Sequence, residues 1–214
     1  MRLLLLLTLL TSAAAAQERQ LMDEVVAVVD ARSVTLSELA AETRIRMVEQ
    51  HGPQMASVPL DRAVLAASLR RLVEERVVLS EVERLKLFDL DHAEVESALA
   101  RLRARFPGAS AWEAFTRQLE LTNDEIGAVL ARELRVARYL DNRLKLAAQL
   151  RDSELEEAWK ASGGQGDREA LRQKLAKEKY ERMLTELLAE LRRRASVRIV
   201  DPLDGTTRSV AERP

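Results

Sequence analysis

The sequence predicts a mainly α-helical protein with a short β-strand near each end of the helical region. Three observations support this fold class. Helix-start signals recur along the chain, apolar residues between them follow a helical spacing, and two short β-branched runs flank the whole arrangement. Pairing of these two strands would close the domain by joining its ends.

The helix starts are marked by capping boxes, in which Ser, Thr or Asp is followed three residues later by Glu. The first side chain can accept a hydrogen bond from an exposed backbone N–H, while the acid reaches back to the start of the helix. The chain has five such pairs: Thr35 and Glu38, Asp91 and Glu94, Ser110 and Glu113, Thr122 and Glu125, and Ser153 and Glu156.

The apolar spacing agrees with these starts. Leu65, Leu69, Leu72 and Val73 lie at positions i, i+4, i+7 and i+8, which places them on one face of a helix. Similar stripes follow Ile126 and Leu184. We therefore expect helices over residues 35–51, 60–87, 91–105, 110–120, 123–148, 153–161 and 167–195.

The strands are expected at 25–30, "VVAVVD", and at 197–200, "VRIV", because both runs are rich in β-branched residues. From Asp201 onward the chain is polar and shows no periodicity. We therefore expect a single helical domain over residues 17–200, followed by a disordered tail over 201–214.

The first 16 residues are typical of a signal peptide. A basic Arg2 precedes the apolar run Leu3 to Leu10, and Ala14 to Ala16 supply the small residues that a signal peptidase requires. The apolar run is much shorter than the ~20 residues that cross a bilayer. We expect cleavage before Gln17, a periplasmic location and no membrane span.

The amino-acid composition excludes several kinds of site and partner. The chain has no cysteine, which excludes disulfides, thiolate metal sites and a cysteine nucleophile. The 34 basic and 35 acidic residues nearly balance and are interspersed, so no nucleic-acid partner is expected. Aromatic residues make up only 3% of the chain, too few for a platform on which bases or sugars could stack.

No residue is predicted to be catalytic, to bind a cofactor or to ligate a metal. The two histidines, His51 and His92, lie far apart and beside predicted helix ends, and no serine has the sequence of a nucleophile elbow. Glu154, Glu156 and Glu157 form an acidic cluster without a nearby histidine, which favours a solvated helix face over a metal site. Substrate-binding residues stay unassigned, because leucines of a core and of a groove look alike in a sequence.

Two further groups of residues have simple structural interpretations. Two basic runs, Arg101, Arg103 and Arg105 and then Arg192 to Arg194, lie at predicted helix C-termini and oppose the helix dipole there. Met47, Met55 and Met183 are either adaptable core residues or part of a broad peptide-binding surface.

The segment "SGGQG" interrupts the helical sequence with Gly163, Gly164 and Gly166. It follows no strand and lacks the lysine and hydroxyl residue of a phosphate loop. An anion site at the start of the next helix, near Asp167, is the alternative to a flexible joint between two helices. We favour the joint.

The order and lengths of these segments resemble the chaperone module of the periplasmic foldase–chaperone family typified by SurA. The likeness runs from "DEVVAVVDARSVTLSEL" through "LRRLVEERVVLSEVERLKL" and "WEAFTRQLELTNDEIGAVLARELRVARYLDNRL" to "DSELEEAW", and it ends with "REALRQKLAKEKYERMLTELLAELRRRASVRIV". It covers nearly all of the expected mature chain. It rests on the pattern of apolar and charged positions and on no invariant signature.

The chain departs from the family pattern at two places. The family usually turns through a glycine after its first strand, whereas this chain has "DARSV", so Asp30 or Arg32 must make the tight turn. Relatives with a parvulin-type prolyl isomerase domain carry it after the segment that matches "DSELEEAW". Only a handful of residues separate Trp159 from Arg168 here, too few for a domain of on the order of 90 residues.

The resemblance implies an ATP-independent periplasmic chaperone, or holdase, that binds unfolded exported proteins such as outer-membrane protein precursors. It implies no cofactor, and isomerase activity does not carry over. The alternative is a non-catalytic adaptor or assembly subunit that binds one specific partner in the periplasm. The sequence does not predict an oligomeric state.

Overall fold

The computed structural model describes residues 23–145 and 147–203, and the expected signal peptide lies outside this part of the chain. The described residues confirm the mainly helical fold class. They form seven α-helices, a short 3-10 helix and three strands, in the order β1 (Val25–Val29), β2 (Arg32–Thr35), α1 (Leu36–His51), η1 (Pro53–Ser57), α2 (Arg62–Arg84), α3 (His92–Arg103), α4 (Ala109–Leu119), α5 (Asn123–Leu144), α6 (Asp152–Ala161), α7 (Arg168–Arg194) and β3 (Val197–Ile199).

The strands form an antiparallel sheet in the order β2-β1-β3. The expected pairing of the two end strands is confirmed, because β1 pairs with β3 and Val28 lies opposite Arg198. Strand β2 was not predicted. It pairs with β1 through a two-residue turn in which Asp30 takes the left-handed conformation at a φ of 52°. Of the two residues expected to make this tight turn, Asp30 and Arg32, it is Asp30 that takes the left-handed conformation.

Asp30 is held in this turn by its neighbours. Its carboxylate accepts a hydrogen bond from the backbone N–H of Ser196 at 2.8 Å and another from the hydroxyl of Ser80 on α2. Its own backbone N–H donates to the Ser196 carbonyl at 2.7 Å. The two bonds to its carboxylate, first that from Ser80 and then that from Ser196, lower the pKa of Asp30. The turn therefore joins the sheet to both α2 and the approach to β3.

In the described part of the chain most of the buried apolar residues belong to two clusters. The first lies between the sheet, α2, the C-terminal half of α5 and the C-terminal half of α7, and it includes Leu69, Tyr139 and Leu191. The second lies between α1, α3, α4 and the N-terminal half of α5, and it includes Trp112, Phe115 and Ile126. Helix α5 passes through both clusters and so connects the two halves of the body.

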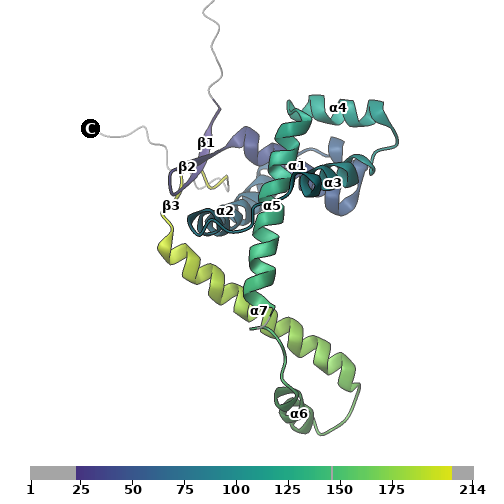
Figure 1. Ribbon diagram of the computed structural model, residues 1–214, viewed down its shortest axis with the longest axis vertical. Helices are drawn as coiled ribbons and strands as arrows, with labels where there is room; N and C mark the ends of the chain where they lie inside the picture. Colours follow the sequence, from purple (N-terminus) through teal and green to yellow (C-terminus); the bar gives the residue numbers. More distant parts are fainter. Residues whose placement is uncertain (1–22, 146, 204–214) are drawn as a thin grey trace, which may run out of the picture.

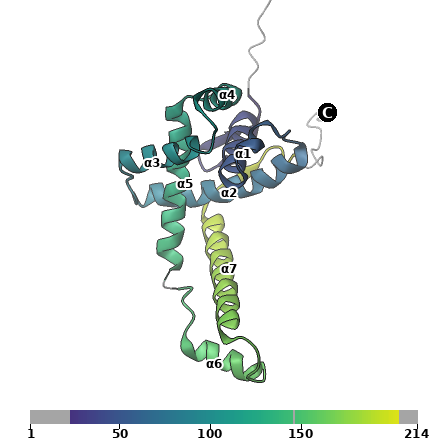
Figure 2. The ribbon, with the colours of Figure 1, turned by 90° about the vertical axis from the view of Figure 1, so that its right-hand side faces the viewer.

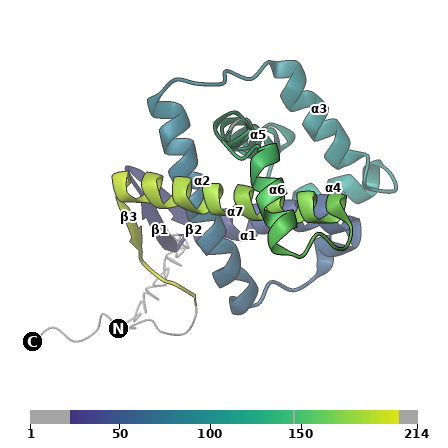
Figure 3. The ribbon, with the colours of Figure 1, turned by 90° about the horizontal axis from the view of Figure 1, so that it is seen from below.

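An arm extends from this body. We define the arm as residues 147–182, which comprise α6 and the N-terminal half of α7, and the body as the remaining described residues. Figures 1 and 2 both show α6 at the end of the molecule remote from the sheet and from α1 to α4. Helix α7 has 27 residues and is about 40 Å long. Seen from below, it crosses α2 and brings its C-terminal end beside the sheet (Figure 3).

Most helix starts match the capping signals, and two do not. Thr122 and Asp91 cap α5 and α3 in complete capping boxes. Helix α4 instead begins at Ala109, after Gly108, so Ser110 lies within the helix. Helix α6 begins at Asp152, and it is the carboxylate of Glu154 that reaches back, to the backbone N–H of Arg151 at 2.8 Å.

The chain stays packed beyond the predicted end of the domain at residue 200. Asp201 and Leu203 are buried, and Leu203 belongs to the first cluster. Arg62 of α2 pairs with the Asp201 carboxylate at 3.3 Å. The segment predicted as a tail therefore begins with packed residues, and the rest of it, 204–214, lies outside the described residues.

Among the described helices, none combines the length and the apolar character needed to cross a membrane.

Candidate functional site

The two histidines occupy helix ends, as expected. His51 is the last residue of α1 and His92 is the first residue of α3, and both are exposed. The Nε2 atom of His92 lies 3.9 Å from a carboxylate oxygen of Glu96, one turn further along the same helix. Within the described ranges, neither histidine is paired with a serine or with a buried carboxylate.

The acidic cluster of α6 is engaged in ion pairs between α6 and α7. Glu154 accepts from the ammonium of Lys179 at 2.8 Å, and Glu156 accepts from Arg168 at 2.7 Å. The bond from Lys179, followed by that from the backbone of Arg151, lowers the pKa of Glu154 to about 2. No group of three or more potential metal ligands occurs among the described residues. The cluster thus fastens the two helices of the arm together.

The glycine-rich segment is a tight connection between α6 and α7. Gly163, Gly164 and Gly166 have φ angles of 81°, 68° and 101°, in the left-handed region that favours glycine. Asp167 then caps α7 by accepting from the backbone N–H groups of Glu169 and Ala170. The N-terminal donors of α7 are thus partly occupied by its own cap, which favours the joint over an anion site.

The basic runs lie at the ends of helices, as predicted, and two of the methionines pack against the apolar clusters. Arg192 to Arg194 are the last residues of α7, and Arg194 pairs with Glu81 of α2 at 3.4 Å. Met55 and Met183 are partly buried and pack against the second and first clusters.

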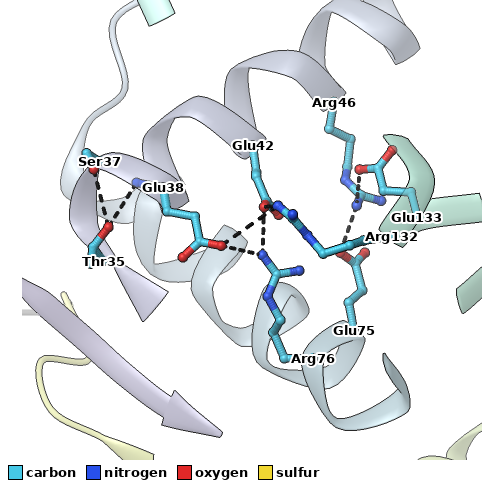
Figure 4. Close-up of polar contacts among 9 residues, drawn as sticks. All are labelled: Thr35, Ser37, Glu38, Glu42, Arg46, Glu75, Arg76, Arg132 and Glu133. Carbon is cyan, nitrogen blue, oxygen red and sulfur yellow. Dashed lines mark hydrogen bonds and ion pairs between the residues drawn. The ribbon is translucent and has the colours of Figure 1, made fainter. Parts of the chain in front are cut away.

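A layer of ion pairs lies where α1, α2 and α5 meet (Figure 4). Its members come from one face of α1 and from two adjacent residues on each of the other helices. They are Glu38, Glu42 and Arg46 of α1, Glu75 and Arg76 of α2, and Arg132 and Glu133 of α5. We call this set the charged layer.

Glu42 lies at the centre of one half of the layer. Its carboxylate accepts from Arg76 at 2.6 Å and also from Arg132, so it joins all three helices. Arg76 bonds in addition to Glu38 at 2.7 Å. The side chains of Glu42 and Arg76 are only 6% and 8% exposed. Both charges are therefore desolvated, and each is compensated by the other.

Arg46 organises the other half. Its guanidinium contacts Glu133 at 2.6 Å and Glu75 at 2.8 Å, so one arginine is shared by two carboxylates. Burial raises the pKa of both carboxyl groups, and for Glu133 the value reaches about 7. The Arg46 charge opposes this rise, while the nearby Glu49 adds to it. The layer therefore contains a carboxyl group that titrates close to neutral pH.

The charged layer was not predicted from the sequence. Glu38, Glu42 and Arg46 follow the i, i+4 spacing in "SELAAETRIR", which also fits a solvated helix face. A signal was nevertheless present, because Leu39 and Ile45 place the apolar face of α1 beside these residues and both are fully buried. A charged stripe adjoining a buried stripe on a short helix is a candidate for burial.

The arm carries apolar side chains outside the two clusters. Leu155 is buried on α6, which contacts α7, so the arm has a small apolar contact of its own. Other apolar residues of the arm are partly buried, and Tyr180 is 41% exposed. The partly buried residues are Ala148, Leu150, Ala158, Trp159, Leu171, Leu175 and Ala176.

Two pockets border the helices of the body. One, of about 370 Å³, lies between α2 and α7 and is lined by Val77, Leu184 and Leu188, with Glu74 and Arg192. The other, of about 410 Å³, lies between α1, α3 and α5. Its lining combines apolar residues with two arginines and two glutamates: Ala98, Leu102, Ala104, Leu130, Leu134 and Ala137, together with Arg101, Arg105, Glu49 and Glu133.

The described part of the chain thus offers apolar surface on an arm and in pockets between helices. No known family model matches this chain, and no curated protein is significantly similar to it.

Proposed function

We propose that this protein is an ATP-independent periplasmic holdase that binds unfolded exported polypeptides, with outer-membrane β-barrel precursors as its clients. The resemblance of the sequence to the SurA-like chaperone module supports this proposal, as does a signal-peptide-like N-terminus. The observation that carries it is the arm, which holds partly exposed apolar side chains away from the body.

The arm has the properties that a broad binding surface needs. Burial of apolar surface contributes about 25 cal/mol per Å², whatever the exact sequence of the bound segment. Trp159, Leu175 and Tyr180 offer such surface on two helices joined by a short turn. The sequence contains no nucleotide-binding motif. Release in this proposal is therefore passive, and it is driven by folding or hand-over of the client.

The body supplies a stable base for this surface. The charged layer joins α1, α2 and α5, and α7 runs from the arm into the first apolar cluster. Client contacts on the arm are therefore expected to leave the body unchanged.

Light scattering tests the holdase directly. A β-barrel precursor is diluted from urea with and without a few-fold excess of the mature protein, and an equal mass of an unrelated helical protein serves as the control. We expect scattering to be suppressed only by the mature protein. Scattering equal to that of the control would refute the proposal.

A second candidate is the adaptor that binds one specific partner, and one observation favours it. β3 lies at the edge of the sheet, and its last residue, Ile199, and the next residue, Val200, are 39% and 44% exposed. An edge strand can accept a strand from a partner through backbone hydrogen bonds. Pull-down from periplasmic extract separates the two candidates, since many unfolded clients indicate the holdase and one stoichiometric partner indicates the adaptor.

We also propose that the chain has no prolyl isomerase activity. Residues 162–167 alone connect α6 to α7, at the place where relatives carry the parvulin domain. A proline cis/trans peptide assay tests this, and acceleration above the uncatalysed rate would contradict it.

A further inference from the structure

The pocket between α1, α3 and α5 has a charge arrangement that the fold does not require. Arg101 and Arg105 line it, and neither has a carboxylate partner among the described residues. Arg101 donates only to the hydroxyl of Ser97, at 2.8 Å. Many other arginines of the chain, such as Arg46, Arg76 and Arg138, do pair with a carboxylate. The two pocket arginines are thus available to an anion from outside.

Opposition to the helix dipole does not account for this placement. Arg103 lies on the same last turn of α3 and serves that purpose equally well, but it does not line the pocket. Arg101 and Arg105 face the pocket because they are four residues apart. The turn continues past the end of α3, since the backbone N–H of Arg105 bonds to the Leu102 carbonyl at 3.1 Å.

The spacing of Arg101 and Arg105 along the helix backbone matches that of an extended peptide. Four residues of helical backbone advance about 6–7 Å along the axis. Alternate residues of an extended chain lie about 6.6–6.8 Å apart and point to the same side. Two acidic side chains separated by one residue can therefore reach Arg101 and Arg105 together.

The opposite wall of the pocket is suited to the peptide residue that lies between the two acidic residues. It is formed by α5, where Leu134 is partly buried and Ala137 is exposed. In an extended chain the intervening side chain points away from its two neighbours. With acidic side chains toward α3, this side chain lies against α5, and an apolar residue fits there.

We propose that this pocket binds an extended client segment in which acidic and apolar residues alternate. The acidic side chains pair with Arg101 and Arg105, and the apolar side chain between them packs on Leu134 and Ala137. The inference rests on the proposed holdase function for the source of the segment. It adds a preference for sequence to the broad binding of the arm.

The carboxylates of the pocket make this binding pH-dependent. Glu133 of α5 and Glu49 of α1 line the pocket and repel an acidic segment. The groups around Glu133 are Glu42, Arg46 and Glu49 of α1, Glu75 of α2, and the two pocket arginines. Since the pKa of Glu133 is about 7, acidification from pH 8 to pH 6 removes one of the two repelling charges.

Fluorescence anisotropy tests the inference with two labelled short peptides, one of alternating aspartate and leucine and one of alternating asparagine and leucine. Both are amidated at the C-terminus, so that only side chains supply carboxylates. We expect the aspartate peptide to bind more tightly, and more tightly at pH 6 than at pH 8. Glu133→Gln is expected to abolish this pH difference.

The double variant Arg101→Gln/Arg105→Gln is expected to weaken binding of the aspartate peptide about tenfold, because two partly exposed ion pairs are lost. The matched control is Arg103→Gln/Arg117→Gln, which removes the same charge from residues that do not line the pocket and is expected to change the affinity less than twofold. Circular dichroism and the urea midpoint establish that both variants are folded.

Equal affinities for the two peptides, or equal losses in the two double variants, would overturn the inference. Binding restored only when the C-terminus is left as a free carboxylate would also overturn it. Light scattering is run on the same samples. If the protein suppresses aggregation but the arginine variants bind the peptide normally, the holdase proposal holds and the pocket proposal is wrong. If the arginine variants bind the peptide more weakly but the protein does not suppress aggregation, only the holdase proposal is wrong.

Discussion

Glu42 is the most enclosed member of the charged layer, and its two arginine partners come from different helices. Removal of one partner from a buried ion pair is costly, because the remaining charge stays desolvated. Arg76, at 8% exposure, would keep only Glu38, whose side chain is 32% exposed. The ion pairs of Glu42 therefore help to hold α1, α2 and α5 together.

Glu42→Ala is expected to lower the free energy of unfolding by about 3 kcal/mol, because it leaves Arg76 and Arg132 without their shared carboxylate. Urea unfolding followed by circular dichroism measures the change. Glu96→Ala serves as the control. Glu96 is exposed and contacts only His92, at 3.9 Å, so its loss is expected to stay within about 0.5 kcal/mol. Equal losses of stability in the two variants would mean that the charged layer stabilises the fold no more than a surface ion pair does.

Glu133 makes the stability depend on pH in an unusual direction. Its folded pKa of about 7 lies above the ordinary value of 4.5, so between these values the folded chain holds a proton that the unfolded chain has lost. Its contribution to stability is therefore largest at low pH and falls as the pH rises through 7.

The difference between the urea midpoints at pH 6 and pH 8 measures this effect. We expect the stability at pH 8, relative to that at pH 6, to be greater for Glu133→Gln than for the wild type. Glu113→Gln, at an exposed residue of α4, is expected to leave the difference as it is in the wild type. If both variants behave like the wild type, Glu133 does not titrate near neutral pH in the folded chain.

At the scale of elements, the arm depends on the attachment of α6 to α7. Lys179 is the main link, since its ammonium bonds to both carboxylate oxygens of Glu154 and to the carbonyl of Gln149. The side chain of Lys179 is only 13% exposed, which shields these bonds from solvent.

Lys179→Gln is expected to speed hydrogen exchange at the backbone amides of α6 and to leave those of α2 unchanged, because α6 packs on α7 and contributes no residue to either apolar cluster. Lys177→Gln is the matched control on the same helix. Its ammonium is exposed and lies 3.8 Å from Glu181, so no change is expected. Faster exchange throughout the chain would show that the arm and the body unfold together.

Local signals predicted the helices well because each start depends on a few adjacent residues. The side chains of Thr122 and Glu125 each accept a hydrogen bond from the backbone N–H of the other residue, without help from the rest of the chain. The signal fails where a residue upstream starts the helix first, as Gly108 does one residue before α4. Thr35 caps α1, but Glu38 turns to Arg76 and does not complete the box.

The elements that escaped prediction depend on distant partners. Strand β2 is four residues long and mostly polar, so it shows no strand pattern, yet Val34 is buried and the strand pairs with β1. The charged layer forms only when α2 and α5 bring opposite charges to α1. The pocket of Arg101 and Arg105 likewise requires α5 as its far wall. Each of these features therefore needs partners that lie far away in the sequence.

At the scale of the whole molecule, the body and the arm have separate roles in the function that we propose. The body is closed by the sheet, which joins the two ends of the domain, and is crossed by the charged layer. The arm extends from it with apolar side chains that the clusters do not cover. A client bound to the arm would thus lie beside a folded base.

Site-specific photo-crosslinking to an unfolded β-barrel precursor tests this account most directly. The crosslinking residue replaces Tyr180 on the arm or, as the control, Leu85 at the end of α2 in the body, and both side chains are 41% exposed. The account predicts strong crosslinks to the unfolded precursor from position 180, weak ones from position 85, and none from either to the folded barrel. Equal crosslinking from the two positions, or none from position 180, would contradict it.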